Sequence, residues 1–224
     1  MRINNTVTAG LLLGLALAAG TAFADDQLSG LTAQWWQSML SMPPGVNPAA
    51  DLTGADCMVG QRGPVWLLAG TFSGGSATRN CSIPQGEWLF FPVVNFVNFN
   101  TPNCNQGPGN LSAETLRSQI VAIVDGATNL SVKLDGEPVK NIVRVKSVVF
   151  AVTLPVDNVF GPNACGVNMG LSGVFSPAID DGFYTLLPPL SAGKHTLHIS
   201  GQMPAANVTV DVTYKLRIVP VLLM

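Results

Sequence analysis

The chain has 224 residues, of which 47% are hydrophobic and only 11% are charged, and its formal net charge is −2. A chain of this length can bury a substantial core within one domain. Average proteins carry about 25% charged residues, and nucleic-acid-binding domains cluster Lys and Arg. The composition therefore argues against nucleic acid as a partner and indicates a surface that is polar rather than ionic.

Residues 1–24 have the pattern of a cleaved secretory signal peptide. Arg2 is followed by the uncharged apolar run from Ala9 to Ala19, and then by the small-x-small sequence Ala-Phe-Ala. The apolar run is shorter than the roughly 18 residues that a membrane crossing requires. We therefore expect a secreted or periplasmic protein whose mature part, residues 25–224, forms a single β-sandwich-like domain without a membrane span.

An even number of cysteines in an exported chain predicts disulfides, and two bonds among four cysteines allow three pairings. We favour Cys57 with Cys81, because they flank one apolar run. Cys104 and Cys165 then form the second bond, because both lie in loops rich in Gly, Pro and Asn. A zinc site is disfavoured, because no two cysteines have the Cys-x-x-Cys spacing.

The first mature segment has helical spacing. Its apolar residues Leu31, Trp35 and Met39 recur every four positions, and a Pro-Pro-Gly sequence follows. This pattern predicts an N-terminal helix over about residues 30–42. Because adjacent side chains on a helix point in different directions, we expect either Trp35 or Trp36 to be exposed.

Most of the remaining pattern is typical of strands. Continuous apolar runs at 65–69 and 87–94 predict strands buried on both faces, and strict alternation from Val208 to Ile218 predicts a half-buried antiparallel strand. Shorter strands are expected at 130–134, 139–155, 183–187 and 195–200. The fold class predicted is mainly β, an antiparallel β-sandwich or jelly-roll-like domain with one or two short packed helices.

One loop and a second helix interrupt the strands. Residues 95–110 are rich in Asn, Gly and Pro and predict a long loop. Ser112 then has the position of an N-cap, and the apolar face that follows predicts a helix over 113–124.

The two histidines are the candidates for chemistry. On a strand, the spacing of His195 and His198 places them on opposite faces, so they cannot readily bind one ion together. His195 with Asp180 or Asp181, both expected in a loop, is the candidate pair for a catalytic site. Ser172 lies in a Gly-Leu-Ser-Gly sequence that does not match the nucleophile motif G-x-S-x-G. We therefore lean towards a protein that is not an enzyme, and we expect no cofactor.

Two further groups of residues are singled out for binding. Asp51 and Asp56 are calcium candidates, although Asp in such loops is more often a turn residue. The candidate ligand-binding residues are Trp36, Arg79, Asp181 and His195. Because aromatic rings often hold sugars and other flat polar ligands, the Trp residues favour a binding surface.

Several motifs together carry a resemblance to a known family. They are the Trp-Trp helix, the segments CMVGQRGPVWLLAG, RNCSIPQG and LFFPVVN, the LDG hairpin, and the segment DDGFYTLLPPLSAGKHTLHISG. With these motifs, the chain resembles a family of uncharacterised exported bacterial proteins over most of its mature length. The resemblance implies export from a bacterial cell and carries over no activity.

These observations favour a non-catalytic binding or structural domain outside the cytoplasm. Its expected partner is a polysaccharide, a cell-surface component or another envelope protein. One alternative is a secreted hydrolase or lyase that uses His195 with Asp180 or Asp181. Another alternative is an assembly or structural protein of the envelope.

Overall fold

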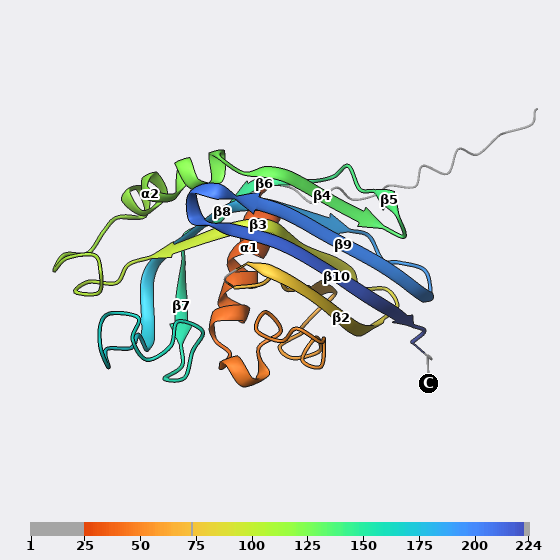
Figure 1. Cartoon of the computed structure of the whole chain (residues 1–224), viewed down its shortest axis with the longest axis horizontal. Coiled ribbons are helices and arrows are strands. Elements are labelled where there is room, and N and C mark those ends of the chain that lie inside the picture. The colour runs from red at the N-terminus through yellow and green to blue at the C-terminus, as the bar shows by residue number, and fades with distance from the viewer. Residues whose placement is uncertain (1–24, 73, 222–224) are drawn as a thin grey trace, which may run out of the picture.

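Two β-sheets of five strands each form the body of the protein (Figure 1). This computed structural model describes residues 25–72 and 74–221, so the predicted signal peptide, residues 1–24, lies outside the described residues. The first sheet, sheet A, contains β1 (Val65–Leu67), β3 (Trp88–Phe99), β8 (Gly173–Leu187), β6 (Val143–Lys146) and β7 (Phe150–Leu154). The second sheet, sheet B, contains β2 (Gly75–Pro84), β10 (Val208–Val219), β9 (Gly193–Met203), β4 (Thr128–Leu134) and β5 (Glu137–Pro138). The prediction of a mainly β fold with short packed helices is confirmed.

Sheet A is buried on both faces, as its continuous apolar runs predict. Along β3, Leu89 and Phe91 pack towards sheet B, whereas Phe90 packs towards helix α1 (Asp25–Leu40). All three side chains are fully buried. A strand covered on both sides has no solvent face, and its residues are therefore apolar in succession rather than in alternation.

Sheet B has one polar face, and β10 shows this most clearly. Buried and exposed positions alternate along β10 over almost its whole length. It pairs antiparallel with β9, as predicted, and parallel with β2. A second parallel pair joins β1 to β3, so each sheet of the sandwich is mixed rather than purely antiparallel. The sequence around β2 was not predicted as a strand, because its buried positions include the charged Arg79 and the small Ala77 and so lack a regular row of large apolar residues.

Two loop predictions are wrong. Residues 95–99 continue β3 because Phe99 is buried and Asn95 and Asn98 have hydrogen-bond partners within the fold. Asp180 and Asp181 lie within β8 rather than in a loop, and both are buried. Each has found polar partners inside the protein, so packing overrides the turn preference of the Asp-Asp-Gly sequence.

Both predicted helices are present. Helix α1 begins at Asp25, earlier than predicted, and its first turn carries acidic residues that suit the helix N-terminus. The hydroxyl of Ser112 caps helix α2 (Ala113–Asp125) by accepting a hydrogen bond from the backbone N–H of Thr115. Two 3-10 turns, η1 (Pro44–Val46) and η2 (Pro204–Ala206), complete the elements. Among the described residues, no helix combines the length and the apolar character that a membrane crossing requires.

Neither tryptophan of α1 is exposed, which corrects the prediction for this pair. Trp35 and Trp36 are both buried, and their rings meet edge to face with centroids 4.9 Å apart. The indole N–H of Trp35 donates to the backbone carbonyl of Leu68, and that of Trp36 donates to Asp180. The two indole N–H groups therefore reach two different places along sheet A, beside β1 and within β8, and both rings are covered.

The predicted disulfide pairing is confirmed. Cys57 is bonded to Cys81 and Cys104 to Cys165, with 24 and 61 residues of sequence separation respectively. The first bond ties the loop before β1 to the middle of β2. The second bond ties together the two long loops that follow β3 and β7.

We expect the Cys57–Cys81 bond to stabilise the fold by roughly 3 kcal/mol, because closing a loop of this length restricts the unfolded chain. Urea unfolding of the Cys57→Ser, Cys81→Ser double variant measures the loss. A double variant that unfolds at the same urea concentration as the parent would contradict this expectation.

Candidate functional site

A pocket opens beside β3, at the place where sheet A loses a strand. β1 is three residues long and pairs with β3 only over Trp88–Phe90. In the described part of the chain, the same edge of β3 has no strand partner from Pro92 to Val97. The pocket lies along this edge and has a volume of about 170 Å³. Residues of α1, of sheet B and of the chain that follows β1 form its other walls.

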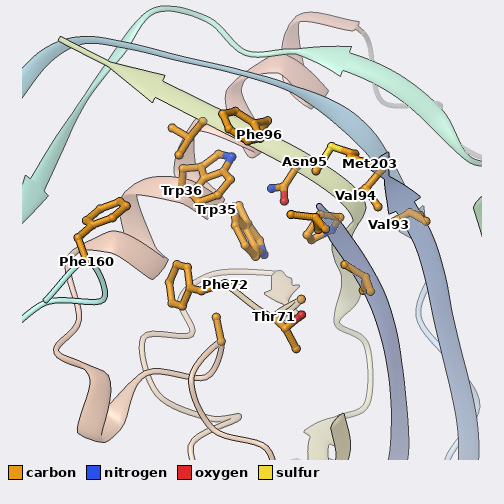
Figure 2. Close-up of a pocket in the computed structure, with 16 residues that line it drawn as sticks. Trp35, Trp36, Thr71, Phe72, Val93, Val94, Asn95, Phe96, Phe160 and Met203 are labelled. Atoms are coloured by element: carbon orange, nitrogen blue, oxygen red, sulfur yellow. The ribbon is translucent and has the colours of Figure 1, made fainter. Parts of the chain in front are cut away.

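The walls of the pocket are mostly apolar and aromatic (Figure 2). The aromatic members are Trp35, Trp36, Phe72, Phe96 and Phe160. Sheet B contributes Met203, Val208 and Val210. These side chains come from α1, from both sheets and from two loops, and the close-up shows them converging on one space. Among the described residues, the lining includes no Asp, Glu, Lys, Arg or His.

Two polar groups interrupt this apolar lining. The side chain of Asn95 faces the pocket (Figure 2), and its amide nitrogen donates to the hydroxyl of Tyr184 over 3.0 Å. The hydroxyl of Thr71 is buried and has no hydrogen-bond partner within the described structure. The hydroxyl oxygen itself is closed to solvent, so Thr71 lines the pocket with the rest of its residue and Asn95 is the polar group that faces the space.

A buried carboxyl group lies behind the pocket wall. Asp180 is fully buried, and it accepts hydrogen bonds from the indole N–H of Trp36 at 2.7 Å and from the hydroxyl of Tyr184 at 2.8 Å. Burial raises the pKa of Asp180 to about 7, although the hydrogen bonds from Tyr184 and Trp36 oppose this rise. Because Tyr184 also bonds Asn95, the protonation of Asp180 is connected to two residues that line the pocket.

Arg79 is buried below the same wall instead of lining the pocket. Only 1% of it is exposed, and its guanidinium donates to the carbonyl oxygens of Asp51, Ala69 and Gly70. It also donates to the hydroxyl of Tyr214, which in turn bonds Ala69. Arg79 therefore fixes the chain that runs from β1 into Thr71 and Phe72, which are two residues of the wall.

Asp181 is held in an ion pair away from the pocket. Its two carboxylate oxygens accept from Nε and from one terminal nitrogen of Arg144, at 2.9 and 2.8 Å. The other terminal nitrogen of Arg144 bonds Asp125 at the end of α2 over 2.5 Å. The hydrogen bonds that Arg144 donates to the carboxylate of Asp181 raise the pKa of Arg144 well above its ordinary value. Asp181 thus joins β8, β6 and α2 and is not part of the pocket lining.

His195 lies on sheet B, and it contacts neither Asp180 nor Asp181. Its Nδ1 is 2.7 Å from a carboxylate oxygen of Asp135, and its Nε2 is 3.0 Å from the carbonyl oxygen of Ser191. The contact with Asp135 raises the pKa of His195, because a ring facing two acceptors is best satisfied as the doubly protonated cation.

The side chains around His195 have the composition of a Ser-His-Asp triad without its proton arrangement. The hydroxyl of Ser191 is 3.4 Å from Nε2 of His195. Nε2 already faces the carbonyl oxygen of the same serine, so it is not available to take the hydroxyl proton. The hydroxyl of Ser191 therefore lacks the base that would activate it as a nucleophile.

The calcium candidates form a turn. The carboxylate of Asp51 accepts from the backbone N–H of Thr53 at 2.7 Å and from that of Asp56 at 3.0 Å. Burial opposes the charged form, yet these hydrogen bonds hold the pKa of Asp51 below its ordinary value. Within the described ranges, no three His, Cys, Asp or Glu side chains lie together as a metal site would require.

Of the four ligand-binding candidates, the structure brings only Trp36 to the pocket. Sequence reasoning missed Asn95, Thr71, Phe72 and Phe160, which all lie in segments with turn-like composition. One signal was present in the sequence, since the apolar run before Thr71 is much shorter than the run that forms β3. A short strand beside a long one leaves part of the long strand without a partner.

The comparisons with known proteins assign no family to this chain. No family model and no curated protein matches it. A solved structure titled "Solution Structure of Amebosin" aligns with 12% sequence identity, covering 63% of this chain and 96% of that chain. Its TM-score is 0.17, and a likeness of that size carries no argument about fold or function.

Proposed function

We propose that this protein is an exported, non-catalytic binding domain whose pocket beside β3 receives a compact apolar group of a cell-surface or envelope component. The observation that carries the proposal is the convergence of five aromatic side chains on one pocket whose other walls are mostly apolar. Export from a bacterial cell is part of the proposal. The signal-peptide pattern, the family resemblance and the two disulfides support it.

The size of the pocket limits what can enter it. Pockets for drug-sized ligands typically have volumes of about 300–1,000 Å³, whereas a dry cavity of about 150 Å³ is enough for a benzene-sized ring. At about 170 Å³, this pocket fits one ring or a short alkyl chain. The remainder of a larger ligand would stay outside the pocket.

The chemistry of the lining limits the ligand further. A charged group would lose its hydration here without meeting an opposite charge, which is costly. The amide of Asn95 can instead bond one neutral polar group, such as an alcohol or an amide. The lining also lacks the His, Cys, Asp or Glu that would serve as a nucleophile or general base, which supports binding over catalysis.

A series of straight-chain primary alcohols tests this proposal. We expect the dissociation constant to fall about fourfold with each added methylene group, because burying one contributes about 0.8 kcal/mol, until the pocket is full. The change in Trp fluorescence measures binding, because Trp35 and Trp36 line the pocket.

Two alanine variants give the matched control. Ala49 lines the pocket and is buried, whereas its neighbour Ala50 is exposed and does not line it. Ala49→Leu should fill part of the pocket and abolish binding of the longer alcohols, and Ala50→Leu should bind them as the parent does. Affinity that rises with chain length equally in both variants would contradict the proposal.

A further inference from the structure

Three cations lie together on the outer face of sheet B, which is the face directed away from sheet A. Lys194 and Arg217 occupy directly opposite positions on β9 and β10, and Lys215 lies two residues from Arg217 on the same face. All three side chains are exposed. The whole chain has only 11 Lys and Arg, so this is a strong local concentration of positive charge in a protein of net charge −2.

The cluster has no acidic partner in the described structure. The ion pairs of sheet B use other residues, because Asp135 pairs with His195 and Asp211 pairs with His198. Like charges directly opposite each other on neighbouring strands destabilise the pair. The fold therefore gains nothing from placing Lys194 against Arg217, and a bound anion would remove the repulsion.

The three cations line a hollow of about 480 Å³ on the surface. The other exposed side chains of this hollow, Asn80, Ser82 and Thr196, carry amide and hydroxyl groups. Cations can bind carboxylates, and the amide and hydroxyl groups can bond the hydroxyls of a sugar. In Figure 1, the three strands that form the hollow, β2, β10 and β9, lie side by side. Helices α1 and α2 pack mainly against strands of sheet A, and so they do not cover this face of sheet B.

We propose that this basic hollow binds an acidic polysaccharide, a chain of sugars that carry carboxylates. The site is separate from the pocket beside β3, and the inference does not depend on it. Among the described residues, the hollow is lined by no Phe, Tyr or Trp on which a nucleic-acid base could stack, and the ring of His195 is held by Asp135 and Ser191. Its apolar members Cys81 and Leu216 are buried, so it offers no side chain for insertion into a lipid surface.

Binding of polygalacturonate, a polymer of uronic acid, tests the inference on the whole mature protein. We expect binding at low salt that weakens on the order of tenfold between roughly 50 and 200 mM salt, because about three ionic contacts release counterions. The triple variant Lys194→Gln, Lys215→Gln, Arg217→Gln should lose at least tenfold in affinity on this basis. It should remain folded and keep the alcohol binding of the pocket.

The matched control removes three other exposed cations with Arg62→Gln, Lys140→Gln and Lys146→Gln, which changes the net charge equally. This control should bind polygalacturonate within about twofold of the parent, since surface charges at a distance are screened. An equal loss in both triple variants, or no binding by the parent, would overturn the inference. Single-stranded DNA or vesicles of anionic phospholipid that bind as tightly as polygalacturonate would overturn the assignment to a polysaccharide.

Discussion

Replacing Arg79 with Met should lower the free energy of unfolding by about 3–5 kcal/mol. The guanidinium is almost completely buried and donates to three backbone carbonyls and to the hydroxyl of Tyr214. Met fills much of the same space but donates no hydrogen bond, so the carbonyl oxygens of Asp51 and Gly70 would lose this donor, while Ala69 and Tyr214 would keep only their bonds to each other. Urea unfolding followed by circular dichroism measures the difference.

Two further variants separate this network from a general effect of removing an arginine. Arg62 is exposed, and Arg62→Met should change the free energy of unfolding by no more than about 0.5 kcal/mol. Tyr214→Phe leaves the backbone N–H of Ala69 without its acceptor and should have an intermediate cost of about 1–3 kcal/mol. If Arg79→Met and Arg62→Met were equally stable, the role of Arg79 as the support of the pocket wall would be wrong.

The stability of the protein should fall as the pH rises from about 4 to about 7 through the titration of Asp180. Burial holds the folded pKa of Asp180 at about 7, above the ordinary value of 3.8. Between these values the folded state keeps a proton that the unfolded state has released, so this contribution is complete below pH 4 and lost above pH 7. Each unit of difference between the folded and unfolded pKa corresponds to about 1.4 kcal/mol, so the free energy of unfolding should fall by about 4 kcal/mol in total over this range.

Asp180→Asn isolates this contribution from that of the other carboxylates. The amide keeps an oxygen that accepts from Trp36 and does not titrate, so the variant should lack the loss between pH 4 and 7. Asp51 and Asp135 have lowered pKa values and act with the opposite sign, and the difference between parent and variant cancels them. Asp157 is exposed, and Asp157→Asn should follow the parent. A difference between parent and Asp180→Asn that does not change with pH would refute the assignment.

Patterns that depend on one element at a time predicted much of the fold. The alternation of β10 reflects only that one face of its sheet is exposed to solvent. The N-cap of α2 depends only on Ser112 and the residues that follow it. The pairing of Cys57 with Cys81 followed from the apolar run between them. These features are local, so the residues that define them lie close together in the sequence.

The candidate site could not be found in this way, because it depends on which segments meet. Asn95 looks like a loop residue until β8 pairs with β3 and Tyr184 reaches its amide. Asp180 looks like part of a turn until α1 brings the indole of Trp36 to it. Nothing near Thr71 in the sequence shows that it lines a pocket made by seven separate stretches of the chain. Such meetings depend on tertiary packing, which overrides the preference of the individual residue.

The arrangement explains why the buried polar groups lie near one another. Arg79 fixes the chain after β1, and Asp180 fixes Trp36 and Tyr184. The hydrogen bonds of Arg79 and of Asp180 thus fix the backbone and the aromatic rings that surround the pocket, while neither Arg79 nor Asp180 lines the pocket itself. A binding site benefits from this support, because side chains locked in place before the ligand arrives lose less entropy on binding.

The measurement that tests the pocket most directly is a set of nuclear Overhauser effects between bound hexanol and the protein. We expect contacts from the terminal methyl group of the alcohol to the methyl group of Met203 and to the rings of Phe72 and Trp36, which all line the pocket. Contacts confined to exposed apolar residues outside the pocket, such as Val156 and Val167, would contradict the account.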